Sequence, residues 1–254
     1  MKLIKKAVDI SIHNILAFPY EIYLVALYSA FSIVCTLLFW KVLFLNVMPQ
    51  GYRPEFIYIL AFCGLCSDGL CDVFFGLRDL DYLVRTGEFD RYLVRPRHPL
   101  YLVVLENMPI ASILEKLILS VGGIFLVCLH FEVSLELLDC LKAVVFLLIG
   151  VSYYELLYGL MTVFSLRFEG ASSLRDLAFQ LNSSKQYPLS IFPMGIKVVL
   201  TYIIPVGLLA YYPAVLLLGM EEPLPKLYLT APVLAVLAPF IYGRCIRHYS
   251  SNGG

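Results

Sequence analysis

Several charged side chains fall inside long apolar runs of this 254-residue chain, where an ionised group is costly and therefore a functional candidate. Asp68 and Asp72 are spaced i,i+4 and would share one face of a helix. Lys116 and Glu155 lie in two later runs. Two interpretations stay open. Either Asp68, Asp72 and Glu155 line a polar substrate pathway, or one of these carboxylates pairs with Lys116 inside a helical bundle.

Signatures of catalysis or metal binding are missing from the sequence. No glycine is followed by lysine, so a P-loop is absent, and neither HExxH nor GxSxG occurs. Cys63 and Cys66 have CxxC spacing, but no nearby histidine or second CxxC accompanies them. Cys128 and Cys140 flank a short predicted loop and could pair in an oxidising compartment. We therefore expect no catalytic residue, no bound metal or cofactor, and no nucleic-acid partner.

The apolar runs would form the helices that hold these charges in place. Hydrophobic residues make up 60% of the chain and charged residues 15%, too few to give a soluble domain a polar surface. A helix needs about 20 apolar residues to cross a membrane. The pattern predicts an all-α polytopic membrane protein forming a single domain over residues 1–254. Six transmembrane helices are expected, near 22–45, 55–76, 108–130, 138–165, 197–218 and 227–243.

Prolines interrupt the last two runs, so their ends are not fixed by the pattern (Pro205, Pro213, Pro232 and Pro239). Two further lysines, Lys41 and Lys142, lie near the ends of their runs. Their long side chains can reach the headgroup region from there. We therefore do not expect them to need a partner inside the bundle.

Basic residues outside the apolar runs are distributed unevenly between alternate connections. The poorer side holds only Arg53 and Lys226. Because lysine and arginine are enriched in cytosolic loops, the richer side and both termini are predicted to be cytosolic, in the inner (plasma) membrane. The richer side carries Lys2, Lys5, Lys6, Arg78, Arg85, Arg91, Arg95, Arg97, Arg167, Arg175, Lys185, Lys197, Arg244 and Arg247.

The first cytosolic connection, residues 77–107, has a pattern of its own. Asp81 and Arg85 would pair on a helix face, beside an apolar stripe that contains Leu80, Leu83 and Val84. Gly87 is a plausible helix stop. A second short helix is expected from Phe89, Tyr92 and Leu93, with Pro96 and Pro99 ending it. Spacing alone is equally consistent with a solvated juxtamembrane face and with a docking surface.

Two other segments have predicted local structure. Residues 1–19 alternate apolar and basic positions as in an amphipathic helix that lies in the membrane interface. The second connection, residues 167–196, should contain a helix around Ser172–Leu181. The Tyr187-Pro188 and Phe192-Pro193 pairs that follow are typical of chain turns at headgroup level.

Two sequence motifs resemble those of a family of six-helix ABC exporter permeases. Gly87-Glu-Phe-Asp-Arg-Tyr-Leu-Val-Arg-Pro96 is similar to the family element G-x-[hydrophobic]-D-x-[YL]-L-x-[RK]-P. The series Tyr187-Pro188, Phe192-Pro193, Ile204-Pro205 and Tyr212-Pro213 is similar to the second half of that family. Both motifs occur in the expected order between predicted spans.

The resemblance implies a permease subunit whose ATPase is a separate polypeptide. Two permeases, identical or different, would assemble with two ABC ATPase subunits in membrane lipid, with ATP and Mg on the ATPases. Residues 1–19 would be the elbow helix, and the first connection would carry the coupling helix. The ATPase-coupling residues would be Asp81, Arg85, Glu88, Phe89, Asp90, Arg91 and Tyr92. Substrate would move outward by alternating access, along a pathway that includes Asp68, Asp72 and Glu155.

Two other classes of protein remain as alternatives. A proton-coupled secondary transporter would use Asp68 or Asp72 as its proton carrier, although no inverted repeat is detectable. An intramembrane enzyme would use Glu155 and Asp68, but it lacks the expected paired acidic and histidine motifs.

Overall fold

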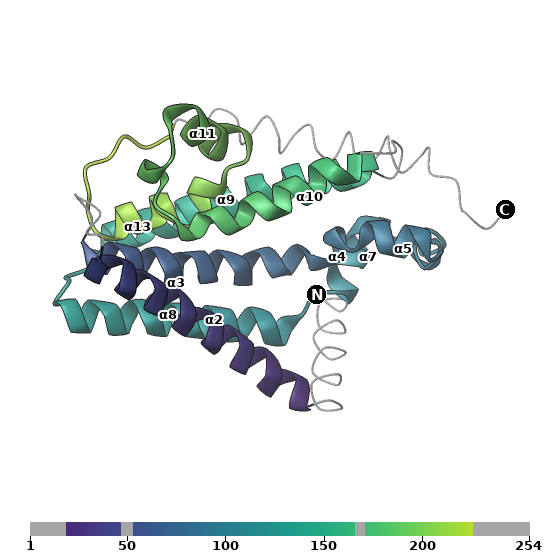
Figure 1. Cartoon of the computed structure of the whole chain (residues 1–254). Helices are drawn as coiled ribbons and strands as arrows, with labels where there is room; N and C mark the ends of the chain where they lie inside the picture. Colours follow the sequence, from purple (N-terminus) through teal and green to yellow (C-terminus); the bar gives the residue numbers. More distant parts are fainter. Residues whose placement is uncertain (1–18, 47–52, 166–170, 226–254) are drawn as a thin grey trace.

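The computed structural model describes residues 19–46, 53–165 and 171–225, and these residues form helices and loops without a strand. Four helices are long and apolar enough to cross a membrane. They confirm the first four predicted spans and the all-α membrane fold. Figure 1 shows them as α2 (Pro19–Asn46), α3 (Pro54–Cys71), α8 (Ile110–Phe131) and α9 (Leu137–Ser165).

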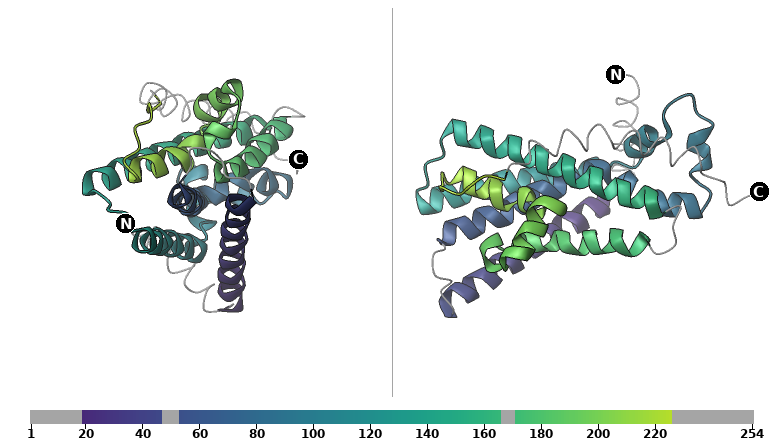
Figure 2. Two further views of the ribbon diagram at one scale, coloured as in Figure 1. Left: turned by 60° about the vertical axis from the view of Figure 1, so that its left-hand side comes forward. Right: turned by 90° about the horizontal axis from the view of Figure 1, so that it is seen from above.

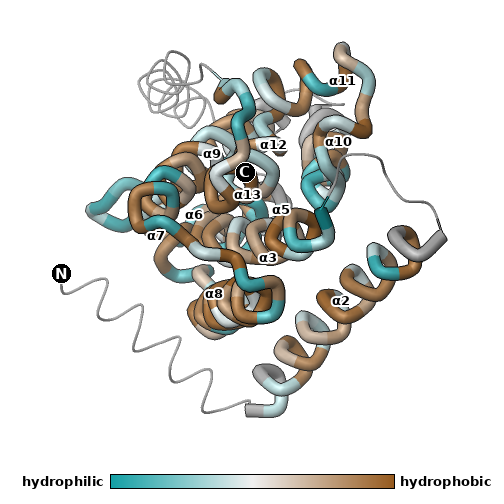
Figure 3. Tube along the Cα trace, turned by 90° about the vertical axis from the view of Figure 1, so that its left-hand side faces the viewer, coloured by the Kyte–Doolittle hydropathy of each residue, from teal (hydrophilic) through white to brown (hydrophobic). Residues whose placement is uncertain are grey.

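Helix α3 is the centre of the bundle, packed between α8 and α9. Phe56, Ile57 and Leu60 on α3 are almost completely buried. A Cβ atom on Gly123 of α8 would lie 2.1 Å from the ring of Phe62, so this glycine allows the two helices to approach closely. Helix α2 is more exposed and crosses the bundle at an angle (Figures 1 and 3), with Trp40 as its buried contact.

The fifth apolar run does not form one transmembrane helix, contrary to the prediction for residues 197–218. It is divided into α11 (Met194–Val198), a π-helical turn at Val199–Ile203, α12 (Val206–Leu209) and α13 (Tyr211–Leu217). The break comes at Ile204, whose backbone is extended before Pro205. The segment then folds against α9, where a Cβ atom on Gly150 would lie 2.6 Å from Leu208 Cβ.

Two predicted elements lie outside the described residues. These are the amphipathic elbow helix of residues 1–19, apart from Pro19, and the sixth span at 227–243. Four of the six predicted spans are therefore seen as single helices within the described ranges, and the six-helix count stays a prediction.

The first connection folds into a small unit at one end of the bundle, which we call the end unit (residues 75–107). It contains α4 (Phe75–Arg78), α5 (Leu80–Arg85), α6 (Asp90–Leu93) and α7 (Pro99–Glu106). Gly87, after α5, has a positive φ of 74°, which confirms the predicted helix stop. Pro99 begins α7 instead of ending the preceding helix, because its missing N–H is harmless in a first turn.

The end unit has a hydrophobic core of its own. The predicted apolar stripe of α5 is buried here, together with two aromatic rings and one face of α7. Leu156 and Leu160 of α9 pack against this core, which attaches the unit to the bundle. The buried side chains are Leu80, Leu83, Val84, Phe89, Tyr92, Leu100, Leu102 and Val103.

The second connection extends along the bundle. The predicted helix is present as α10 (Ala171–Asn182), which lies beside α9 (Figures 1 and 2). Tyr154 of α9 donates a hydrogen bond to the carbonyl of Ala178 at 3.3 Å. The chain continues through a short turn, Ser183–Gln186, which brings Lys185 to α3. Tyr187 then contacts Trp40 of α2, with ring centroids 6.0 Å apart.

Candidate functional site

The end unit presents an exposed surface that faces away from the bundle. The ion pair between Glu88 and Arg91, with atoms 4.0 Å apart, lies there, and both side chains are about half exposed. Five large apolar side chains are also exposed on the same unit: Phe75, Tyr82, Leu93, Val94 and Tyr101, of which Val94 is 84% exposed. A mixed surface of this kind suits contact with a protein partner.

Burial divides the predicted ATPase-coupling residues into two groups. Phe89 and Tyr92 are buried and hold the end unit together, whereas Glu88 and Arg91 reach solvent. Asp90 is half-buried at the start of α6. Asp81 and Arg85 lie on α5, and their predicted ion pair involves side chains outside the described ones.

Tyr92 organises the polar side of the end unit. Its hydroxyl oxygen accepts hydrogen bonds from Arg91 at 2.7 Å and from Asn107 at 3.3 Å. The guanidinium groups of Arg91 and Arg95 lie over its ring at 4.8 and 5.6 Å. The hydrogen bond to Tyr92 raises the pKa of Arg91, so this exposed cation stays charged. Arg95 also pairs with Glu106, which joins α6 to α7.

A network of charged side chains connects the end unit to three transmembrane helices. Asp72, just after α3, pairs with Lys116 of α8 and accepts a hydrogen bond from Ser112 at 3.0 Å. Arg78 of α4 lies 4.0 Å from Asp72 and forms a second, closer ion pair with Glu155 of α9. Two carboxylates and two cations therefore balance one another at the base of the end unit.

A separate ion pair lies deeper along α3. The ammonium group of Lys185 pairs with Asp68 and lies 3.4 Å from the side-chain oxygen of Asn182. The Lys185 side chain is 5% exposed, but that of Asp68 is 40% exposed. Asp68 is therefore the most exposed of the three predicted pathway carboxylates.

The structure shows the Lys116 pairing that was the second sequence-based interpretation, with Asp72 as the partner. Asp68 and Asp72 do not share one site, because they bind different lysines. Arg78 and Lys185 were expected in cytosolic connections from the distribution of basic residues, and not in ion pairs with α9 and α3. Charge balance is the signal that could have found them, since carboxylates deep inside apolar runs need cations nearby.

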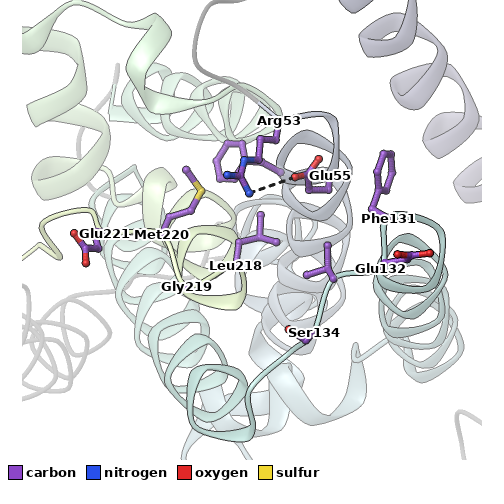
Figure 4. A pocket seen from close by; sticks show the side chains of 11 residues that line it. Arg53, Glu55, Phe131, Glu132, Ser134, Leu218, Gly219, Met220 and Glu221 are labelled. Atoms are coloured by element: carbon purple, nitrogen blue, oxygen red, sulfur yellow. Dashed lines mark ion pairs between the residues drawn. The ribbon is translucent and has the colours of Figure 1, made fainter.

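A pocket lies at the other end of the bundle, between the start of α3, the α8–α9 loop and the end of α13 (Figure 4). Its volume is about 580 Å³. Arg53 and Glu55 form an ion pair of 3.9 Å on its wall, and Glu132 and Glu221 add negative charge. This pocket opens on the side that the distribution of basic residues predicts to be extracytoplasmic.

The described residues contain no group of three or more histidine, cysteine, aspartate or glutamate side chains that could hold a metal ion. Cys63 is buried within α3, and Cys128 and Cys140 are free thiols, not a disulfide. Asp68, Asp72 and Glu155 instead form ion pairs with cations of other elements.

Comparison with known proteins gives one match. A family model described as ABC-2 family transporter protein matches residues 30–253, which is most of the chain. The match includes the end unit, the charge network and the broken fifth run. No curated protein and no solved structure matches the chain.

Proposed function

Because this chain belongs to the ABC-2 transporter family and is an integral membrane protein, we propose that it is the permease subunit of an ATP-binding cassette exporter. A separate ATPase subunit would bind ATP and Mg. Two permease subunits, identical or different, and two ATPases would form the complex in the inner (plasma) membrane. Both termini would be cytosolic, and substrate would move outward by alternating access.

The observation that carries this proposal is the connection between the end unit and the bundle. Glu88 and Arg91 are on the exposed side of the unit, where an ATPase would dock. On the opposite side, Arg78 pairs with Glu155 of α9 and lies near Asp72. A movement of the exposed side on ATPase docking would therefore be transmitted to helices α3, α8 and α9 through ion pairs as well as through the covalent backbone.

We propose different roles for the three predicted pathway carboxylates. Asp72 and Glu155 hold the end unit to the bundle, since their side chains are only 11% and 2% exposed. Asp68 is the better candidate for contact with substrate because of its exposed edge. To shift the permease almost fully from one conformation to the other, the ATPases must favour one state by about 5.5 kcal/mol.

The rival proton-coupled mechanism needs a carboxylate that gains and loses a proton during transport. Asp68 and Asp72 each have a lysine partner. Each of these carboxylates is therefore held in a contact between two elements, which fits a structural link better than a proton carrier.

The test is reconstitution of the chain with and without its ATPase partner in vesicles. We expect the chain alone to hydrolyse no ATP. With the ATPase, ATP turnover should increase when the two proteins are reconstituted together and should be lost when a Walker-A lysine of the ATPase is replaced. Substrate movement driven by a pH gradient without ATP would contradict the proposal.

A further inference from the structure

Lys41 differs from the other lysines in the membrane-spanning helices. Lys116 and Lys142 each pair with an aspartate, as Lys185 does from the turn after α10, whereas Lys41 has no ion-pair partner within residues 19–46, 53–165 and 171–225. It lies within the apolar span of α2, two residues before the end of the membrane-crossing stretch Tyr23–Leu43. A cation at this depth is favourable only if it reaches water or an anion.

An apolar crevice of about 410 Å³ begins beside Lys41. It lies between α2, α3 and α8, and a volume of this size is typical of ligand sites, which range from about 300 to 1,000 Å³. Its walls extend over seven residues of each helix, from Lys41 to Val34 on α2 and from His130 to Gly123 on α8. At the rise of an α-helix this is a length of about 10 Å. Both helices end at the same end of the bundle, so the two basic side chains lie at the crevice's outer limit (Figure 1).

The chemistry of the crevice changes along its length. Below Lys41 and His130, the walls are formed by aliphatic side chains and Phe62. Tyr58, near the start of α3, adds a hydroxyl group at the outer end. Water would be poorly accommodated along such walls, whereas an acyl chain matches them. A phosphate at the outer end would accept hydrogen bonds from the ammonium, imidazole and phenol groups.

We propose that this crevice binds one anionic phospholipid, with its acyl chain between α2 and α8 and its phosphate at Lys41 and His130. The cation that lacks a carboxylate partner within the described protein then obtains its anion from the membrane. This site is separate from the end unit and from Asp68. It does not depend on whether the chain works with an ATPase.

The test uses Trp40, the only tryptophan of the chain and the neighbour of Lys41. The full-length protein is reconstituted in mixed phosphatidylglycerol and phosphatidylcholine vesicles in which one lipid carries bromine on its acyl chain. Bromine quenches tryptophan fluorescence at short range. Quenching is compared between vesicles with brominated phosphatidylglycerol and vesicles with brominated phosphatidylcholine, which gives the relative affinity of the two lipids near Trp40. We expect phosphatidylglycerol to be preferred about fivefold, as one lysine near an anionic lipid provides.

Lys41→Gln should remove this preference, and Lys41→Arg should retain it. Lys142→Gln is the matched control, because Lys142 is also near the same end but pairs with Asp139 at 2.6 Å. Val34→Phe should fill the crevice and reduce quenching by both lipids. Its control is Val121→Phe, an exposed position on α8 outside the crevice.

Three results would overturn the proposal. Equal affinity for the two lipids in the unmodified protein would show that Lys41 extends to water. A preference that survives Lys41→Gln would place the anion elsewhere. Loss of the preference on addition of inorganic phosphate would show a site for free anions and not for a lipid. Circular dichroism and gel filtration identify any variant that has failed to fold. If Lys41→Gln fails to fold, Lys41→Arg, which keeps the charge, tests whether the lipid preference is retained.

Discussion

The guanidinium group of Arg78 is bound to the carboxylate of Glu155, 77 positions later in the chain. Arg78 belongs to α4 of the end unit and Glu155 to the middle of α9, and their side chains are 15% and 2% exposed. Arg78 also lies over the ring of Tyr158, 5.7 Å from its centre. This contact is the most buried link between the proposed docking surface and the transmembrane helices.

Removing either partner of this pair should strongly destabilise the protein. In Glu155→Leu the buried guanidinium keeps only the more distant Asp72, and loss of one partner of a buried pair costs about 3–5 kcal/mol. The double variant Arg78→Met with Glu155→Leu leaves no buried charge unpaired. It should unfold at a higher temperature than either single variant, measured in detergent. Additive losses in the double variant would show that the two side chains act independently.

Inverting the exposed ion pair of the end unit should separate ATPase coupling from folding. The exchange Glu88→Arg with Arg91→Glu keeps the two charges together but reverses the pattern offered to a partner. We expect normal membrane insertion with a loss of ATPase co-purification. The exchange Arg53→Glu with Glu55→Arg, made in an ion pair at the opposite end, is the matched control. Unchanged co-purification in the first variant would place the docking surface elsewhere.

Asp68 can be tested for a role in the pathway independently of its effect on stability. Asp68→Asn leaves the buried ammonium of Lys185 without its anion, so the thermal midpoint should fall. Adding Lys185→Gln removes the stranded charge and should restore the midpoint. If Asp68 contacts substrate, ATP-driven transport stays low in this stable double variant. Full recovery of transport would make Asp68 a structural residue only.

Gly76 should tolerate no side chain, because α4 and α7 touch there. A Cβ atom at this position would lie 2.4 Å from the carbonyl oxygen of Val103. Gly76→Ala should therefore destabilise the end unit by about 1–3 kcal/mol, as overpacking does. Gly122→Ala on α8 is the control, since its Cβ would meet nothing within 4 Å and alanine favours the helix. Equal thermal midpoints for the two variants would contradict the close contact.

The regular parts of the fold could be predicted because their signals are local. Four apolar runs gave four long helices, since a span of about 20 apolar residues needs no tertiary partner to be recognised. The stripe of Leu80, Leu83 and Val84 and the stop at Gly87 are equally local. The fifth run was predicted wrongly as one helix. Its proline breaks permit either a kinked span or a folded segment, and packing against α9 decides between them.

Residue types and their spacing were enough to predict a helical membrane protein, a small amphipathic unit after its second span, and charges inside its spans. Each of these follows from a short stretch of the chain. Which charges meet depends on how the helices pack. Asp68 and Lys185 are 117 positions apart, and Asp72 could have paired with any cation brought near it. Ion pairing depends on distance in space, which helix packing sets and spacing along the chain does not.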